Sequence, residues 1–149
     1  MIQLHRVLLA TDFSDCSRAA QAYACNLVEQ FGGELHVLHV LADPVLMMPE
    51  PGTPASLPQN YLVDLKESAE KMLDGLIPAE WASRYSVRRA TRLGSPGPEI
   101  VRYAEEHQID LIVLGTHGRG AVAHLLLGSV AERVVRQAKC PVLTFRPST

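Results

Sequence analysis

The sequence predicts a doubly wound α/β fold, in which a five-stranded parallel sheet carries helices on both faces. Five short apolar runs typical of strands alternate with longer runs that have helical spacing. The fourth short run, at residues 110–114, is almost wholly apolar, as expected of a strand buried on both faces of a parallel sheet. The connections are long enough for helices, and the length suits one domain, so we expect residues 1–149 to form a single domain.

The first expected elements follow one another closely. Residues 6–10 form a short β-rich run, and Ser14 can then cap a helix whose end is predicted at Gly32. Residues 34–40 have the composition of the second strand. Residues 42–58 hold five of the ten prolines, so we expect no regular element there.

The second half of the chain continues the alternation of helices and strands. A glycine- and proline-rich stretch at residues 94–98 is expected to be a turn that leads into a helix extending to about His107. The remaining helices are expected at residues 60–76 and 129–138, and the remaining strands at residues 87–92, 110–114 and 141–146.

The charge balance gives no reason to expect binding to nucleic acid or to an anionic membrane. The formal net charge is −2, and the arginines are scattered apart from Arg88, Arg89 and Arg92, which we interpret as a solvated strand edge. No apolar run approaches the ~20 residues needed to span a bilayer. Residues 1–6 lead directly into a strand pattern without a leader-like segment, so we expect a cytoplasmic protein.

The cysteines and histidines predict neither a redox centre nor a metal site. Cys16 and Cys25 stand nine residues apart on one expected helix and therefore face opposite ways, while Cys140 stands alone before a proline. His36 and His39 are three residues apart on an expected strand, so their side chains also point to opposite faces. No nucleophile–base pairing stands out, and we assign no catalytic residue.

The strongest functional signal follows the fourth expected strand. Ligands of parallel sheets bind beyond the carboxyl ends of the strands, where the strand order reverses. The segment there is rich in glycine, and its last glycine opens a helix together with Ser129; the glycines are Gly115, Gly118, Gly120 and Gly128. A helix start offers unpaired N–H groups and the positive end of the helix dipole, which suit a phosphate. The alternative, from spacing alone, is that these glycines only turn the chain and cap the helix.

Other polar residues can complete a site at this edge of the sheet. Ser129 adds a hydroxyl, and His117 and Arg119 add donors or charge. Asp12, directly after the first strand, can accept hydrogen bonds from ribose hydroxyls or hold Mg²⁺ through water; the alternative is that Asp12 and Ser14 cap the turn. The P-loop pattern and the G-x-G-x-x-G dinucleotide pattern are both absent from the sequence.

Gly115-x-x-Gly118, nine further residues and Gly128-Ser129 together resemble the G-2x-G-9x-G-S/T pattern of ATP-binding universal stress proteins. The resemblance covers essentially the whole chain, because further blocks are similar to those of the family at residues 7–12, 38–40, 110–115, 128–133 and 140–142. The glycine spacing, together with Asp12 and the last block, is far more specific than any one part.

The resemblance implies a strand order of 3-2-1-4-5, with a crevice between strands one and four. It implies an adenine nucleotide (ATP, ADP or AMP) whose base lies beside Ala10, Thr11 and Val40 and whose ribose is bound by Asp12. Mg²⁺ would be held through the phosphates, near Asp12. The implied phosphate site consists largely of backbone groups, from Gly115, His117, Gly118, Arg119, Gly128, Ser129 and Val130.

The resemblance also implies a homodimer formed through the last strand, residues Val142–Phe145. An apolar edge strand needs cover; the alternative is an edge protected by Pro141 and Arg146. The implied function is that of a stress-response regulator, a signalling or protective module that responds to the nucleotide and acts on a protein partner. Two alternatives remain: a slow ATPase of the related adenine-nucleotide-dependent group, and an interaction module that binds no nucleotide. Any hydrolysis should be slow, because no residue is evidently placed as a general base.

Overall fold

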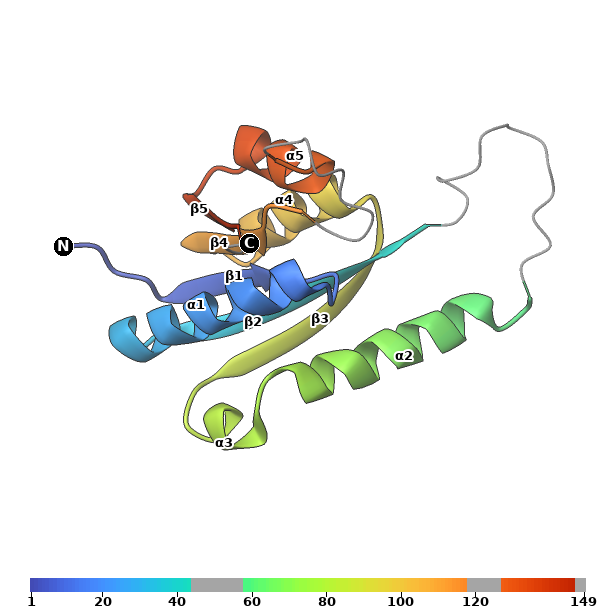
Figure 1. Cartoon of the computed structure of the whole chain (residues 1–149), viewed down its shortest axis with the longest axis horizontal. Coiled ribbons are helices and arrows are strands. Elements are labelled where there is room, and N and C mark those ends of the chain that lie inside the picture. Colours follow the sequence, from blue (N-terminus) through green and yellow to red (C-terminus); the bar gives the residue numbers. More distant parts are fainter. Residues whose placement is uncertain (44–57, 118–126, 147–149) are drawn as a thin grey trace.

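All five strands lie parallel in one sheet, in the expected spatial order. The computed structural model describes residues 1–43, 58–117 and 127–146. Within these ranges the order is β3-β2-β1-β4-β5 (Figure 1). The strands are β1 (Arg6–Ala10), β2 (Glu34–Ala42), β3 (Val87–Gly94), β4 (Leu111–Gly115) and β5 (Val142–Phe145). The predicted fold class is confirmed.

Helices cover both faces of the sheet, and each face has its own set (Figure 1). One face is covered by α1 (Asp15–Phe31), α2 (Tyr61–Leu76) and the short α3 (Ala79–Ala82). The other face is covered by α4 (Pro96–Glu106) and α5 (Ser129–Gln137). Across the described ranges, no helix combines the length and the apolar composition needed to cross a membrane.

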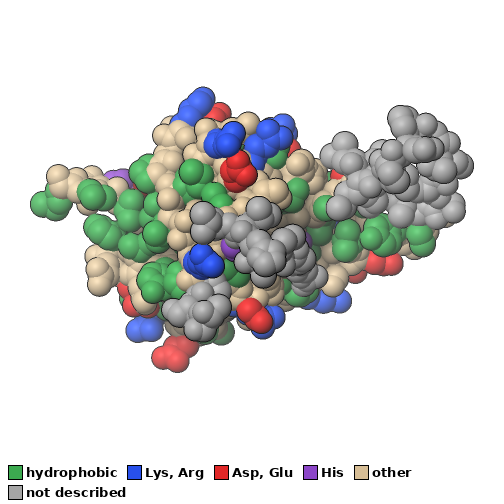
Figure 2. All heavy atoms as spheres, turned by 45° about the horizontal axis from the view of Figure 1, so that its top comes forward, with side chains coloured by type: hydrophobic (Ala, Val, Ile, Leu, Met, Phe, Trp, Pro, Cys, Tyr) green, Lys and Arg blue, Asp and Glu red, His purple; other side chains and the backbone are tan. Residues whose placement is uncertain are grey.

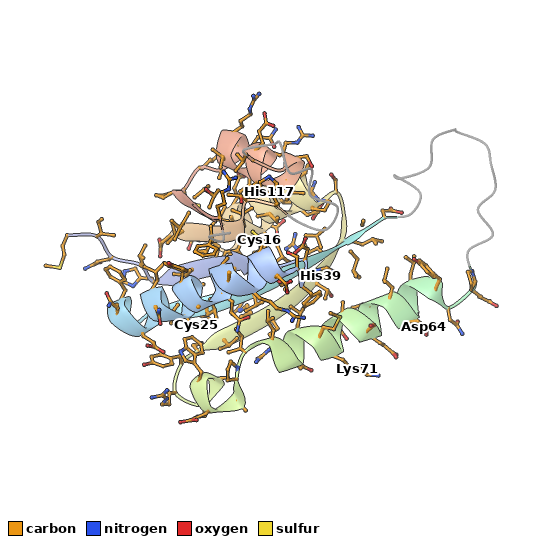
Figure 3. The ribbon with its side chains drawn as sticks, in the orientation of Figure 1. Cys16, Cys25, His39, Asp64, Lys71 and His117 are labelled. Atoms are coloured by element: carbon orange, nitrogen blue, oxygen red, sulfur yellow. The ribbon has the colours of Figure 1, made fainter. Side chains whose placement is uncertain are left out.

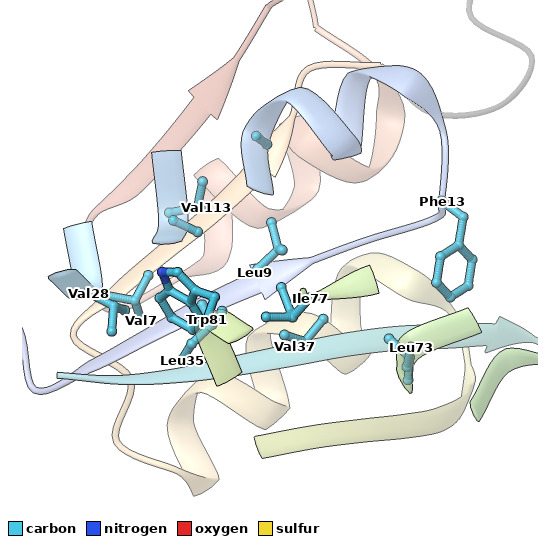
Figure 4. Close-up of a cluster of buried hydrophobic side chains, with 12 residues drawn as sticks. Val7, Leu9, Phe13, Val28, Leu35, Val37, Leu73, Ile77, Trp81 and Val113 are labelled. Carbon is cyan, nitrogen blue, oxygen red and sulfur yellow. The ribbon is translucent and has the colours of Figure 1, made fainter. Parts of the chain in front are cut away.

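Two apolar clusters, one on each face, follow from the alternation of side chains along the strands. On β1, Val7 and Leu9 point into the cluster beneath α1, α2 and α3, whereas Leu8 and Ala10 point into the cluster beneath α4 and α5. Figure 4 shows the first cluster, which has Trp81 near one end and Phe13 at the other. Because both faces are buried, the central strands need apolar residues at every position.

The capping signals of α1 are confirmed, whereas two other boundaries differ from the expectation. Ser14 occupies the N-cap, where its Oγ accepts a hydrogen bond from the N–H of Ser17 at 3.3 Å, and Gly32 ends the helix with a φ of 72°. α4 begins at Pro96, inside the stretch expected to be a turn, because proline fits the first turn of a helix. α3 was not expected; its own Trp81 ties it to α1, because the indole N–H donates to Glu29 at 2.5 Å.

The strand order reverses between β1 and β4. β1 pairs with β2 on one side, with Ala10 opposite Leu38, and with β4 on the other, with Leu9 opposite Val113. The chain leaves β1 toward α1 on one face and leaves β4 toward α5 on the other face. This is the topological position at which open α/β sheets bind ligands.

Candidate functional site

Three segments that are distant in the sequence meet beyond the carboxyl ends of β1 and β4. Gly115, the last residue of β4, lies so close to the first turn of α1 that a Cβ built on it would stand 2.7 Å from Sγ of Cys16. The N–H of Gly128, just before α5, donates to the carbonyl of Thr116 at 2.6 Å. Figure 3 shows Cys16, His39 and His117 gathered at this end of the sheet. The β1–α1 turn, the exit of β4 and the start of α5 therefore adjoin one another.

Gly115 and Gly128 stand where neighbouring protein atoms leave no room for a side chain. A Cβ on Gly115 would also stand 3.0 Å from the carbonyl carbon of Cys16, and one on Gly128 would stand 2.8 Å from the carbonyl oxygen of Thr116. Backbone atoms cannot swing aside as a flexible side chain does, so either substitution forces segments apart. The sequence left two explanations for these glycines, a phosphate site or the turning and capping of the chain, whereas the contacts explain them by the close approach of protein segments. A change at Gly128 alone is therefore a poor test of phosphate contact.

The β1–α1 turn is held by hydrogen bonds among its own residues. Thr11 is buried, and its Oγ1 accepts from the N–H of Phe13 at 3.0 Å and lies 3.1 Å from the hydroxyl of Ser17. Oδ1 of the half-buried Asp12 accepts from the N–H of Ser14 at 3.0 Å. Asp12 thus does cap the turn. A carboxylate has about four acceptor positions, so this bond is compatible with a ligand contact.

The start of α5 has no side-chain cap within the part of the chain that the structure describes. Gly128 occupies the N-cap in an extended conformation, with φ −70° and ψ 160°, and offers no side-chain acceptor to the N–H groups of the first turn. Ser129 is exposed and Val130 is half-buried. At the start of α1, by contrast, Ser14 supplies the acceptor. Uncapped N–H groups and the positive end of a helix together favour an anion.

Ala10 and Val40 lie on the same side of the sheet as α5. Both side chains belong to the apolar cluster beneath α4 and α5. The N–H of Thr11 donates to the carbonyl of Leu38 at 2.9 Å, so Leu38 turns its backbone groups toward β1. Along a strand, backbone groups of every second residue point to the same side, so those of Val40 point beyond the last residue of β1.

The exit of β4 is tied to the edge strand β5. The N–H of the buried Thr116 donates to the carbonyl of Phe145 at 2.8 Å, and Sγ of Cys16 lies 3.4 Å from the same oxygen. His117 follows, with its Nδ1 3.0 Å from Oγ1 of Thr116. Gly118 and Arg119, both expected beside the phosphates, lie outside the described residues.

Three residues of this edge were not identified from the sequence: Phe13, His39 and Thr116. Phe13 has a φ of 63°, and its ring centroid lies 4.6 Å from that of His39. Nδ1 of His39 lies 2.8 Å from the carbonyl oxygen of Thr11. The sequence argument weighed His39 only as a metal ligand; its position beside Val40, at the carboxyl end of a strand next to β1, was the available signal. In the described ranges, no group of three His, Cys, Asp or Glu residues could hold a metal ion.

A connected group of ionisable residues with shifted pKa values lies away from this edge, near the amino end of β2. His36 is 1% exposed; its Nδ1 lies 2.9 Å from the hydroxyl of Tyr103 and its Nε2 lies 3.2 Å from Oε2 of Glu34. Burial lowers the pKa of His36 and raises the pKa of Tyr103. Burial alone would raise the pKa of Glu34, but the hydrogen bonds with Ser86 and His36 outweigh this effect, so the pKa of Glu34 is lowered. The expectation that His36 and His39 face opposite ways is confirmed, since they contact α4 and the β1–α1 turn respectively.

The three cysteines are free of disulfides. Burial, with a contribution from Glu29, raises the pKa of Cys25 to about 11, and burial also raises the pKa of Cys140. Both thiols therefore stay protonated near neutral pH, which makes them poor nucleophiles.

The arginines of β3, expected as a solvated strand edge, are paired with carboxylates; Arg88 is exposed, whereas Arg89 and Arg92 are half-buried. The pairs join Arg88 to Glu34, Arg89 to Asp74, and Arg92 to both Glu99 and Glu106. Over α5, side chains of both signs also lie next to one another (Figure 2), and Arg136 pairs there with Glu132 at 2.8 Å. The pair of Arg136 with Glu132 is exposed, and exposed pairs contribute little to stability.

Comparisons with known proteins point to one family. The model of the universal stress protein family matches residues 3–146. Universal stress protein MJ0531 of Methanocaldococcus jannaschii is 35% identical over 144 residues, which cover 95% of this chain and 81% of that protein. The structure of the universal stress protein UspA from Lactobacillus plantarum matches with a TM-score of 0.77 and 26% identity, over 98% of this chain and 100% of that one. A universal stress protein solved in complex with cAMP has the same fold, with a TM-score of 0.72 and 24% identity over 99% of this chain and 100% of that one.

Proposed function

This chain belongs to the universal stress protein family, and we propose that it binds an adenine nucleotide, ATP or AMP, beyond the carboxyl ends of β1 and β4. The observation that carries the proposal is the meeting of three segments at this one place: the turn with Asp12, the exit of β4 and the uncapped start of α5. A relative of the same fold was solved with cAMP, an adenine nucleotide. The chain's G-2x-G-9x-G-S/T spacing supports placing it in the ATP-binding subgroup.

The phosphates, in this proposal, bind at the start of α5. The N–H groups that follow Gly128, the hydroxyl of Ser129 and the backbone of Val130 would act as donors, with Gly115 and His117 on the β4 side. Gly118 and Arg119 complete the proposed set. The N–H groups of the first turn of α5 are held by the helix, so their positions are fixed before the ligand arrives.

The base and the ribose bind on the β1 side. Asp12 accepts hydrogen bonds from ribose hydroxyls, while its bond to the N–H of Ser14 keeps the carboxylate in place. The base lies beside Ala10 and Thr11, and the backbone groups of Val40 hydrogen-bond with it. Their direction past the end of β1, which follows from the bond between Thr11 and Leu38, supports this assignment.

Mg²⁺, where the nucleotide carries it, is held through the phosphates, with Asp12 as the nearest carboxylate of the proposed site. Mg²⁺ usually keeps several waters and takes few protein ligands, so a single carboxylate fits this arrangement. Its contribution would be to neutralise phosphate charge and orient the phosphate chain.

Nucleotide occupancy would then regulate a stress response, through a homodimer and a protein partner. β5 lies at the edge of the sheet, where Leu143 is exposed and the ring of Tyr23 packs against that of Phe145 with centroids 4.7 Å apart. An exposed apolar edge supports pairing with a second copy. Light scattering should report a dimer that Leu143→Lys converts to a monomer; a monomeric wild type would contradict the pairing.

The binding proposal is tested on gently purified protein. Denaturation followed by mass spectrometry should release an adenine nucleotide, and ATP should raise the melting temperature of nucleotide-free protein. Finding neither would overturn the proposal and favour the nucleotide-free interaction module. Release of phosphate that is lost in Asp12→Ala would instead favour the slow ATPase.

A further inference from the structure

Phe13, the residue after Asp12, has a backbone conformation that bulky residues rarely adopt. Its φ of 63° lies in the left-handed region. Such a conformation costs on the order of 1–3 kcal/mol and persists only where surrounding contacts impose it. The contacts of Phe13 therefore identify what holds the β1–α1 turn in its shape.

His39, from the neighbouring strand β2, makes one contact with Phe13 and a second contact with Thr11. Its ring lies against that of Phe13, with centroids 4.6 Å apart, and its Nδ1 lies 2.8 Å from the carbonyl oxygen of Thr11. A carbonyl oxygen only accepts, so Nδ1 carries a proton and donates. One side chain thus holds the residue before Asp12 by a hydrogen bond and the residue after it by ring contact. In Figure 3, His39 lies at the end of the sheet where Cys16 and His117 also lie.

We propose that His39 is the positioning residue that holds Asp12 where the ribose of the nucleotide is bound. The inference rests on the proposed function. His39 acts through Thr11 and Phe13, so its effect on binding is indirect. Because Oδ1 of Asp12 is bonded to the N–H of Ser14, the carboxylate moves with the turn, and releasing the turn displaces it.

The hydrogen-bond requirement separates this role from simple packing. An asparagine at position 39 can place an N–H donor where Nδ1 stands, whereas a glutamine places its amide one atom further out, where Nε2 stands. A leucine keeps apolar volume but has no donor. If His39 only filled space, leucine would be at least as good a replacement as asparagine.

His107 provides a matched control on another element. Its Nδ1 lies 3.0 Å from the carbonyl oxygen of Tyr103, and its ring stacks on that of Tyr103 with centroids 3.9 Å apart. It therefore makes the same two kinds of contact as His39, at the end of α4 rather than beside Asp12. Replacing His107 by leucine removes the same two kinds of contact as His39→Leu does, but it leaves the β1–α1 turn unchanged.

The experiment measures the dissociation constants of ATP and of inorganic triphosphate by calorimetry, with the melting temperature of each unliganded variant. His39→Leu should weaken ATP about tenfold or more, because the ribose contact is misplaced, while triphosphate, which has no ribose, should bind as to the wild type. His39→Asn should retain most of the ATP affinity and His39→Gln should not. His107→Leu should leave both constants unchanged.

The outcomes separate this inference from the proposed function. A wild type that binds no adenine nucleotide would overturn both. A wild type that binds ATP, with unchanged affinity in His39→Leu, would overturn the inference alone, as would equal loss of ATP and triphosphate. If His39→Leu does not fold, the asparagine and glutamine variants decide, and equal weakening in these two would overturn the inference.

Discussion

The two edges of the sheet use polar groups in opposite ways. At the amino ends of the strands, Oδ2 of Asp110 accepts from the N–H groups of both His5 and Arg6, at 2.7 and 2.8 Å, and Glu34 accepts from the hydroxyl of Ser86 at 3.1 Å. At the carboxyl ends, α5 starts at a glycine that offers no side-chain acceptor. Carboxylates at the first edge therefore accept hydrogen bonds from the protein itself, whereas at the second edge we propose that the first turn of α5 binds a ligand.

This difference also distinguishes structural from functional polar residues. His36 and His39 stand on the same strand, yet His36 closes a buried network with Tyr103 and Glu34, while His39 reaches the turn that carries Asp12. No buried side-chain nitrogen or oxygen in the described ranges lacks a partner. The hydrogen-bond partners of these two histidines therefore separate a structural role for His36 from the role that we propose for His39.

We expect the largest loss of stability from Gly115→Val, which tests whether α1 and β4 pack closely together at the carboxyl edge of the sheet. Its Cβ would stand 2.7 Å from Sγ of Cys16, and overpacking of this kind lowers the free energy of unfolding by about 1–3 kcal/mol. Urea denaturation measures the loss. Gly75→Ala on α2, where nothing lies within 4 Å of the built Cβ, is the control and should not destabilise. Equal stability of the Gly115 variant and the wild type would show that α1 and β4 do not approach so closely.

The next effect concerns the amino edge. Asp110→Ala removes the acceptor of two backbone N–H groups, and we expect a loss of about 2 kcal/mol in the free energy of unfolding with unchanged ATP affinity. The exposed Glu67 on α2 offers a control, since Glu67→Ala should change stability by less than about 0.5 kcal/mol. Loss of ATP affinity in Asp110→Ala beyond what the lower stability explains would break the distinction between the two edges.

A smaller effect is expected from pH, through His36. Because burial lowers the pKa of His36 below 6.5, the unfolded chain binds a proton at pH values where the folded chain does not. Stability is therefore fully present above about pH 6.5 and falls as the pH decreases toward the folded pKa. Glu34, whose pKa is lowered from 4.5, adds a further loss below about pH 4.5.

Urea denaturation between pH 7.5 and about pH 5 checks the contribution of His36. His36→Gln should flatten this pH dependence of the free energy of unfolding. A wild type that becomes more stable as the pH falls through this range would contradict the assignment.

The smallest effect on stability is expected from Ser129→Asp. An acidic residue in the first turn of a helix is favoured by the helix dipole, so the free energy of unfolding should rise slightly, by about 0.3–1 kcal/mol. Ser129→Asn serves as the uncharged control. A marked destabilisation would show that the start of α5 is not the positive helix end inferred here.

Much of the fold and part of the candidate site could be predicted from the sequence, because the signals that mark them are local. The short apolar runs predicted the strands, and Ser14 and Gly32 marked the ends of α1. The expected parallel sheet selected Asp12 and the Gly115–Ser129 segment by their position after strands, and the glycine spacing of the segment added the family resemblance.

The remaining features depend on contacts between distant residues, which no local pattern encodes. Gly115 is constrained by Cys16 and Gly128 by Thr116, so the sequence could mark these glycines without giving the reason for them. α3 is tied to α1 by the bond from Trp81 to Glu29, and the proposed role of His39 depends on the carbonyl of Thr11 in the β1–α1 turn. Such roles appear only once the strand order is known.

ATP calorimetry on the wild type and on Ser129→Asp tests whether the start of α5 holds the phosphates of an adenine nucleotide. We expect the wild type to bind ATP and Ser129→Asp to bind it about tenfold or more weakly, although the variant is as stable as the wild type or slightly more so. The added carboxylate stabilises the helix but repels the phosphate. A wild type without measurable binding, or a variant with unchanged affinity, would contradict the assignment of the phosphates to this helix start.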